Sequence, residues 1–408
     1  MTGWRAPART EQAAAAHAAA EADRAARPER YRLDPDAVAA RAARHPGDEA
    51  AFAAGWREGL ERYLASAAED GRLDALGTGM VVSTAVGRLR AGAKLARHLE
   101  AQPGAVARAR DLAPPIVIVG GWRTGTTFLF RLLATDPRLR APLPAELADP
   151  CRVAGLTDAE RDAFLDASAA AHDLLHLLNP ELRAIHDSGA RLPEECVLGM
   201  GADLRNWGFT STVRLDGYAE WLATQDLGGT YRHHRELLGV LDRGDGRRWV
   251  LKAPAHTAEL PSLVGAFPGA VIVHLHRDIV ETVASGASLF AVFRSTYSDD
   301  VDPVDVGRFQ ADQTERWFRR AQAYRADPAS SAATFVDLDY RDLVRDPATA
   351  VAAVYAAADL APPPDLPAFL RAHDEAQPRH AHGAHRYTAA DFGLDEGELR
   401  ERFAFLDV

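Results

Sequence analysis

The sequence contains almost no cysteine and no long apolar run. Its two cysteines, Cys151 and Cys196, cannot build a disulfide framework, and no Cys/His spacing is typical of a zinc site. No stretch approaches the roughly 18 apolar residues that a membrane-spanning helix needs. The Ala-rich start also carries Glu and Asp, which indicates a solvated helix rather than a targeting signal. These absences favour a soluble protein of a reducing compartment, and we expect it in the cytoplasm.

Lysine is also nearly absent, since almost every basic residue is an arginine. Lys94 and Lys252 are the only lysines, so Lys252 is a candidate functional group, with a stray surface lysine as the alternative. The formal net charge of −11 argues against general nucleic-acid binding, although a local basic pocket for a phosphorylated ligand is compatible with it. The 408 residues, 47% of them hydrophobic, suffice to bury a large core.

The texture of the sequence changes near residue 111. Residues 11–101 are rich in Ala, Arg and Glu with apolar positions at helical spacing, which predicts a helical N-terminal region. Beyond it, short β-branched and apolar runs alternate with helical patterns. Buried strands are predicted at Ile116–Val119, Trp249–Lys252, Ala270–Leu275 and Thr334–Leu338. Such alternation predicts an α/β fold with a parallel sheet flanked by helices.

Helical spacing predicts helices at Thr126–Ala134, Ala258–Ala266 and Ile279–Phe290. Between Pro142 and Gly246 the pattern predicts mostly short helices and loops without a strand. We therefore expect a helical extension over residues 1–110 and an α/β domain over residues 111–408.

A glycine- and threonine-rich segment, GGWRTGTT at residues 120–127, joins the first predicted strand to the first helix behind it. Its glycines allow backbone N–H groups to turn inward, and the helix N-terminus adds partial positive charge. Thr126 and Thr127 supply hydroxyl groups. The segment is therefore predicted to bind phosphate, with a simple glycine turn as the alternative.

In nucleoside-triphosphate enzymes the phosphate loop has the sequence GxxxxGK followed by Ser or Thr, and the lysine and a magnesium ion bind the terminal phosphates. The loop of this chain differs from that pattern. Here Thr126 occupies the lysine position, and the cation is Arg123 inside the loop. No strand that ends in an aspartate able to hold magnesium is evident. These features favour a donor with fewer phosphates and no metal.

Residues 123–127, RTGTT, resemble the 5′-phosphosulfate loop of the sulfotransferases that use 3′-phosphoadenosine 5′-phosphosulfate (PAPS). That family also has an arginine at a strand end and a serine eight residues later, both on the donor's 3′-phosphate, as Arg277 and Ser285 are spaced here. The resemblance runs from about Ala113 to the C-terminus and is closest to the bacterial branch. It implies a P-loop sulfotransferase fold and transfer of a sulfuryl group to a hydroxyl or amine of a small-molecule acceptor. The other product would be 3′-phosphoadenosine 5′-phosphate (PAP).

The resemblance also implies a donor site, without metal. Its residues would be Gly121, Trp122, Arg123, Thr124, Gly125, Thr126, Thr127, Arg277 and Ser285. The RKGxxG segment that closes over the nucleotide in cytosolic members is absent, and Arg386 and Tyr387 lie in the comparable region. Arg386 is a candidate phosphate clamp, with a solvated basic turn as the alternative. His380, His382 and His385 lack a nearby carboxylate ligand and give only weak support for a metal.

Sulfuryl transfer requires a cation for the leaving phosphate and a base for the acceptor hydroxyl. Arg123 is the predicted cation. Glu146 is the first candidate base, because it resembles the glutamate that follows the loop in the tyrosine-directed branch. His256 is the second candidate, and Lys252 would add positive charge near the transferred group. The pair Glu194–Glu195 ranks lower as a lining of the acceptor pocket.

Two other functions remain open at this stage. A P-loop kinase or nucleotide hydrolase would need a lysine and a magnesium carboxylate that the sequence does not show. A catalytically idle nucleotide-binding protein would keep the loop for folding alone. Alcohol, phenol, amine and sugar acceptors are all compatible with the sequence, and no oligomeric state follows from it.

Overall fold

The computed structural model describes residues 3–45, 47–377 and 387–406 and is organised around a five-stranded parallel sheet. The strand order is β2-β3-β1-β4-β5. The strands are β1 Ile116–Gly120, β2 Leu139–Arg140, β3 Arg248–Lys252, β4 Val271–His276 and β5 Thr334–Asp339. The parallel sheet is therefore confirmed, and four of its strands lie within one residue of the predicted bounds.

Strand β2 escaped prediction because it has only two residues, too few to show a period. It extends the sheet by pairing with Arg248 and Trp249 at the start of β3. This pairing makes β2 the edge strand.

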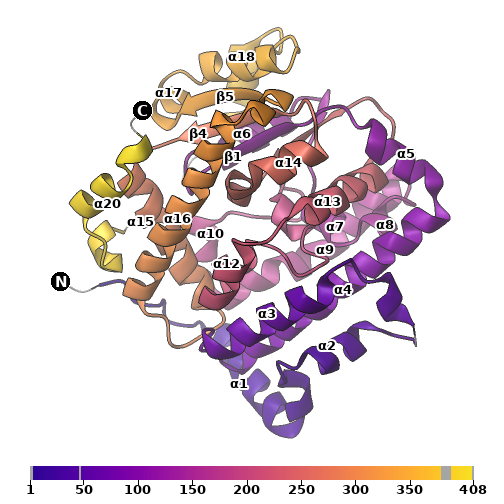
Figure 1. Ribbon diagram of the computed structural model, residues 1–408, viewed down its shortest axis with the longest axis vertical. Coiled ribbons are helices and arrows are strands. Elements are labelled where there is room, and N and C mark those ends of the chain that lie inside the picture. The colour runs from indigo at the N-terminus through magenta and orange to yellow at the C-terminus, as the bar shows by residue number, and fades with distance from the viewer. Residues whose placement is uncertain (1–2, 46, 378–386, 407–408) are drawn as a thin grey trace.

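Helices make up most of the rest of the chain, and loops connect them (Figure 1). The α-helices of the N-terminal region are α1 Glu11–Ala26, α2 Pro35–Ala42, α3 Trp56–Glu69, α4 Ala75–Ala101 and α5 Pro103–Asp111. The later α-helices are α6 Thr126–Ala134, α7 Pro144–Ala148, α8 Pro150–Val153, α9 Asp158–Leu178, α10 Leu182–Ile185, α11 Phe209–Thr212, α12 Asp216–Leu222, α13 Gly228–Leu241, α14 Leu260–Ala266, α15 Ile279–Arg294, α16 Pro303–Ala326, α17 Tyr340–Arg345, α18 Pro347–Ala357, α19 Leu366–Ala376 and α20 Glu396–Arg402. The 3₁₀ helices are η1 Pro28–Tyr31, η2 Asp48–Ala51, η3 Cys196–Leu198, η4 Pro254–Glu259, η5 Pro328–Ala332, η6 Ala389–Phe392 and η7 Ala404–Leu406. Among the described helices, none is long and apolar enough to cross a membrane.

The prediction of mostly short helices and loops between Pro142 and Gly246 missed α9, which runs for 21 residues. Thr157 and Glu160 form a capping box at its start, a signal that was available in the sequence. Much of α9 is exposed and rich in Ala and Asp, so its apolar stripe is weak. The propensity of alanine and the cap therefore matter more here than periodicity.

Each face of the sheet is covered by its own layer of helices. Ile116 and Ile118 of β1 point into a cluster with α6 and α18, whereas Val117 and Val119 join a larger cluster that includes Trp317 of α16. Because side chains alternate along a strand, a fully apolar β1 supplies both layers. The strand ends that carry the phosphate loop are thereby held between two packed layers.

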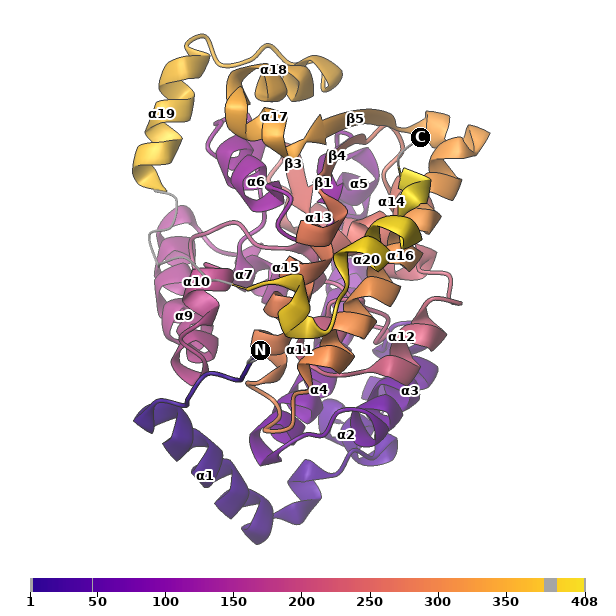
Figure 2. The ribbon, with the colours of Figure 1, turned by 90° about the vertical axis from the view of Figure 1, so that its left-hand side faces the viewer.

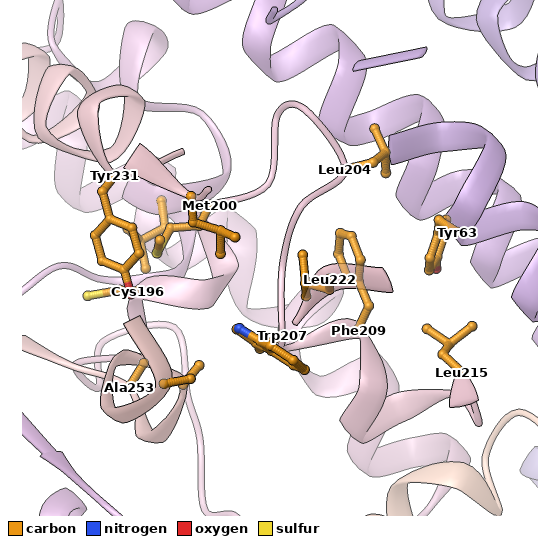
Figure 3. Close-up of a cluster of buried hydrophobic side chains, with 14 of the residues drawn as sticks. Tyr63, Cys196, Met200, Leu204, Trp207, Phe209, Leu215, Leu222, Tyr231 and Ala253 are labelled. Carbon is orange, nitrogen blue, oxygen red and sulfur yellow. The ribbon is translucent and has the colours of Figure 1, made fainter. Parts of the chain in front are cut away.

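The N-terminal helices share the larger of these cores. Figure 3 shows Tyr63 of α3 near Phe209 in a cluster that also holds Tyr231 and Ala253. The ring centroids of Tyr63 and Phe209 lie 4.8 Å apart. In Figures 1 and 2, α1, α2 and α3 lie at the end of the molecule opposite α17 and α18. The helical region is confirmed, while its division from the α/β domain at residue 110 stays a prediction.

Two glycines of helix α4 test this packing. A Cβ atom at Gly77 would collide with the backbone carbonyl of Tyr297, whereas one at Gly87 would meet nothing within 4 Å. We expect Gly77→Ala to lower the free energy of unfolding by about 1–3 kcal/mol through overpacking. Gly87→Ala should raise it by about 0.5–1 kcal/mol because alanine favours helix. Urea unfolding of the full chain measures both changes. Equal changes in the free energy of unfolding would contradict the described packing of α4 against Tyr297.

Candidate active site

The loop between β1 and α6 has the backbone geometry of a phosphate-binding turn. Gly120 and Gly125 have φ values of 138° and 89°, in the region that favours glycine. A Cβ atom at Gly120 would collide with the carbonyl of Leu275 on the neighbouring strand. Arg123 also has a positive φ, 58°, which a non-glycine residue adopts only when its surroundings enforce it. The loop therefore holds Arg123 in a defined position.

Buried hydroxyl groups hold this loop in shape. Thr124 is buried, and its hydroxyl donates to the carbonyl of Gly121 at 2.9 Å. The N–H of Gly120 donates to Thr257 Oγ1 at 2.9 Å. Thr257 lies in η4, directly behind β3, so β3 and β1 are tied together at the loop.

A pocket of about 390 Å³ opens beside the loop. It is lined by Trp122, Arg123, Gly125, Thr126, Thr127, Phe128, Arg131, Arg183, Ala184, Ile185, His186, Asp187, Glu195, Pro254, Arg277, Leu289, Tyr340, Leu343 and Val344. We call it the loop pocket. It collects side chains from the ends of four strands or the segments behind them, as expected where the C-terminal ends of parallel strands meet.

Arg277 lies against the loop although it is 154 residues away from Arg123 in sequence. Its Nη1 donates to the carbonyl of Arg123 at 2.7 Å, and its guanidinium lies 4.4 Å from the ring centroid of Tyr340. Ser285 is buried on α15. The next residue, Gly286, approaches the loop so closely that a Cβ atom there would lie 2.6 Å from Cδ1 of Trp122. The structure thus places Arg277 against the loop and Ser285 on the helix beside it, although Ser285 does not line the loop pocket.

Lys252 is a buried residue of this site rather than a stray surface lysine. Its side chain is 3% exposed, and its Nζ lies 2.6 Å from Glu195 Oε1 and 3.3 Å from Thr127 Oγ1. The end of β3 therefore delivers an ammonium group to the first turn of α6. Glu195, which ranked low in the sequence, is its ion-pair partner and lines the loop pocket.

The two predicted bases do not line the loop pocket. Glu146 is 1% exposed; its Oε1 accepts from Arg161 at 2.6 Å and its Oε2 from the N–H of Leu143 at 2.9 Å. His256 is fully buried, with Nδ1 2.8 Å from the hydroxyl of Tyr231. Burial lowers the pKa of His256 to about 3, so this imidazole is neutral at physiological pH. Each is already engaged inside the protein.

The remaining predicted residues lie near the C-terminus. Arg386, together with His380, His382 and His385, lies outside the described residues. Tyr387 is half-buried and packs against the hydrophobic clusters of the body.

Sequence reasoning missed Phe128 and Tyr340, which line the loop pocket. Tyr340 stands directly behind the predicted strand Thr334–Leu338, and the end of a parallel strand is where ligands bind in such sheets. That position was the available signal.

Within the described residues, one cluster has the composition of a metal site: His274, His276 and Asp337. Its carboxylate is already occupied, since Arg325 pairs with both oxygens at 2.6 Å and His276 Nε2 lies 2.7 Å from Oδ1. A metal ion would have to displace the guanidinium of Arg325. We therefore interpret the cluster as an ion-pair network.

Known proteins share this architecture. The chain is 28% identical over 264 residues to the omega-hydroxy-beta-dihydromenaquinone-9 sulfotransferase Stf3 of Mycobacterium bovis and to that of Mycobacterium tuberculosis. The match covers 57% of this chain and 60% of each relative, so the chain spans about 60% of the length of these curated relatives.

Two solved structures are similar over most of their length. The sulfotransferase STF1 of Mycobacterium tuberculosis H37Rv superimposes with a TM-score of 0.73 at 28% identity, covering 88% of this chain and 93% of that one. The sulfotransferase STF9 of Mycobacterium avium gives 0.74 at 24% identity, covering 86% and 91%, and supports the fold. The model of the sulfotransferase family matches residues 114–364, more than half of the chain, and this protein therefore belongs to the sulfotransferase family.

Proposed function

We propose that this protein transfers a sulfuryl group from PAPS to a hydroxyl or amine of a small-molecule acceptor and releases PAP. The observation that carries the proposal is the contact of Arg277 Nη1 with the carbonyl of Arg123. It sets a cation from the end of β4 beside the phosphate loop, as a nucleotide with phosphates at both ends requires. Phe128 and Tyr340 supply aromatic rings in the same pocket on which a purine can stack.

The loop residues would divide the work of holding the donor. Backbone N–H groups at the start of α6 and the hydroxyls of Thr126 and Thr127 face phosphate oxygens. Arg123 neutralises the charge that develops on the leaving phosphate, and Lys252 stabilises the transferred group from the end of β3. Both cations are placed before the donor arrives, because Arg123 donates to the carbonyl of Ile185 at 2.8 Å and Lys252 pairs with Glu195.

Glu195 is the base that the geometry favours. Its carboxylate is 2.6 Å from Lys252, whose ammonium also reaches Thr127 at the phosphate loop. A hydroxyl of an acceptor in the loop pocket can donate its proton to this carboxylate while its oxygen attacks the sulfur. Glu146 would first have to leave Arg161, and the imidazole of His256 would have to leave the core, so both stay as alternatives.

A second ion pair supports the same wall of the loop pocket. Glu194 Oε2 lies 3.5 Å from His186 Nε2, and Glu194 Oε1 accepts from the N–H of Glu195 at 2.8 Å. Burial opposes charge on His186, but Glu194 and then Glu195 raise its pKa above the usual value. Burial would raise the pKa of Glu194, yet His186 and then Lys252 lower it to about 2. Glu194 therefore positions Glu195 through a charged network.

The acceptor is proposed to be a hydroxyl-bearing small molecule with apolar parts. The name of the mycobacterial relatives describes a hydroxylated menaquinone derivative as their acceptor. In this chain Ile185, Leu289 and Val344 give the loop pocket apolar walls. Both cysteines are unpaired, which accords with the cytoplasmic location included in this proposal.

Binding of PAP without metal tests the donor site. By calorimetry, we expect PAP to bind in the absence of magnesium and Arg277→Ala to weaken binding about 10- to 100-fold, the effect of losing a charge-assisted hydrogen bond. Arg345→Ala, an exposed arginine of α17 paired with Asp342, is the matched control and should leave the affinity unchanged. Selective binding of ATP with magnesium would instead indicate a kinase or nucleotide hydrolase.

Turnover tests the base. With labelled PAPS and an acceptor found by screening alcohols, phenols and amines, Glu195→Gln should lower kcat about 100-fold or more. The affinity for PAP should stay within about threefold, because Glu195 is proposed to act on the acceptor and not on the donor. Glu146→Gln and His256→Gln serve as comparison variants. Loss of turnover in one of these with full activity in Glu195→Gln would move the role of base, and PAP binding without turnover of any acceptor would indicate an idle binding protein.

Stability against pH tests the pair of Glu194 and His186. Because the pKa of Glu194 is lowered and that of His186 is raised, the pair stabilises the fold between the ordinary pKa values of the two groups. This contribution is lost as the pH rises through the raised pKa of His186 or falls through the lowered pKa of Glu194. The wild type should therefore exceed Glu194→Gln in free energy of unfolding by more at pH 5.5 than at pH 9. NMR titration should also show a lower pKa for His186 in the variant. A difference that does not depend on pH would show that the pair carries no linked proton.

A further inference from the structure

A second pocket lies beside the loop pocket, and five arginines are among its lining residues. It has a volume of about 270 Å³. Its arginines come from α6, β2, α9, the segment before Leu192 and the loop just before β3: Arg131, Arg140, Arg161, Arg191 and Arg247. We call it the arginine pocket. Such convergence is unusual in a chain of net charge −11, where basic groups are outnumbered by acidic ones.

Two of these arginines are more than nine-tenths buried and have unused donors. Arg131 is 8% exposed and Arg140 is 7% exposed. Within the described part of the chain, Nε of Arg131 and Nη1 of Arg140 find no hydrogen-bond partner. A buried donor without an acceptor is unfavourable. Both side chains also line the arginine pocket, where an oxygen-bearing ligand would lie next to them.

Arg140 is held in place without being neutralised. Its guanidinium lies 4.0 Å from the ring centroid of Trp249, and its nearest carboxylate, that of Asp242, is 4.0 Å from Nη1. Burial lowers the pKa of Arg140 to about 10, which still leaves it charged at neutral pH. A bound anion would stabilise this charge.

Most of the arginines that line the arginine pocket are paired with carboxylates. Glu146 is the only carboxylate among the described residues that line the pocket, and Arg161 and the N–H of Leu143 occupy its oxygens. Outside the lining, each of the other arginines has its own ion-pair partner or partners. Asp187 pairs with Arg131, Asp162 and Asp166 with Arg191, and Asp245 with Arg247. Among the described arginines of the pocket, Arg140 is therefore the one without a carboxylate within hydrogen-bond distance.

We propose that the arginine pocket binds a tetrahedral oxyanion, a phosphate or sulfate group, either free or as the end of an organic ester. Guanidinium groups match such oxygens through paired N–H donors, and donors from several directions suit an ion with four oxygens. The site is distinct from the donor site, and the proposal does not depend on the proposed transfer reaction. Arg131 lines both pockets, so an ester that is long enough can reach from one to the other.

Equilibrium dialysis of the full chain against inorganic phosphate tests the site. We expect one phosphate per chain in the arginine pocket, and Arg140→Gln should weaken this binding about tenfold or more, the effect of one charge-assisted contact. Arg243→Gln removes the same charge from the loop that carries Arg247 but outside the pocket, where Arg243 pairs with Asp158, and should leave the affinity unchanged. Arg277→Gln should also leave it unchanged, because that residue lines only the loop pocket of the two.

Several results would overturn the proposal. Binding weaker than about 10 mM would mean that no oxyanion site exists. Binding that survives Arg140→Gln but is lost in Arg277→Gln would place the ion at the phosphate loop. If Arg140→Gln unfolds, Arg247→Gln, at a side chain 38% exposed, should weaken phosphate binding at least threefold relative to Arg243→Gln, and no difference would refute the site.

Comparison of ligands identifies the source of the oxyanion. Hexyl phosphate that binds more tightly than inorganic phosphate, with the same loss in Arg140→Gln, would support a site for the end of an organic ester. Equal affinities with the same loss would support a site for the free ion.

Discussion

The hydrogen bond from Arg277 to the carbonyl of Arg123 joins the two halves of the candidate active site. It links the end of β4 to the turn behind β1, which are adjacent parallel strands. Because parallel strands end at a common edge, this contact needs no special connection, only an arginine at the first position behind the strand. The strained backbone of Arg123 and the packing of α15 on Trp122 then leave the loop one arrangement.

The charged side chains are distributed unevenly over the molecule. The chain is acidic overall, yet its cations are gathered where anions would bind: Arg123, Lys252 and Arg277 around the loop pocket, and arginines around its neighbour. Buried cations need partners, and Glu195 supplies one for Lys252. In the proposed reaction the same carboxylate accepts the proton of a bound acceptor. In that proposal, the ion pair between Glu195 and Lys252 both holds the cation in place and positions the base.

Much of the fold was predictable from local pattern. The apolar runs that became β1, β3, β4 and β5 stand out because a parallel strand is buried on both faces. The two residues of β2 have no such signal. Helix α9 was missed because its many alanines and aspartates weaken the apolar periodicity. The position of Arg277 and of the loop at strand ends was predictable for a similar reason, because each is a short segment that directly follows a strand.

The candidate base illustrates the opposite case. Position in sequence favoured Glu146, but only packing shows that Arg161 holds it while Glu195 lies beside Lys252 in the loop pocket. The sequence by itself determined the alternation of strands and helices, the loop and its cations, because these depend on neighbouring residues. Only the tertiary structure decided which carboxylates meet which cations and that two buried arginines share a pocket. Those pairings join distant segments, and no local pattern encodes the distance between them.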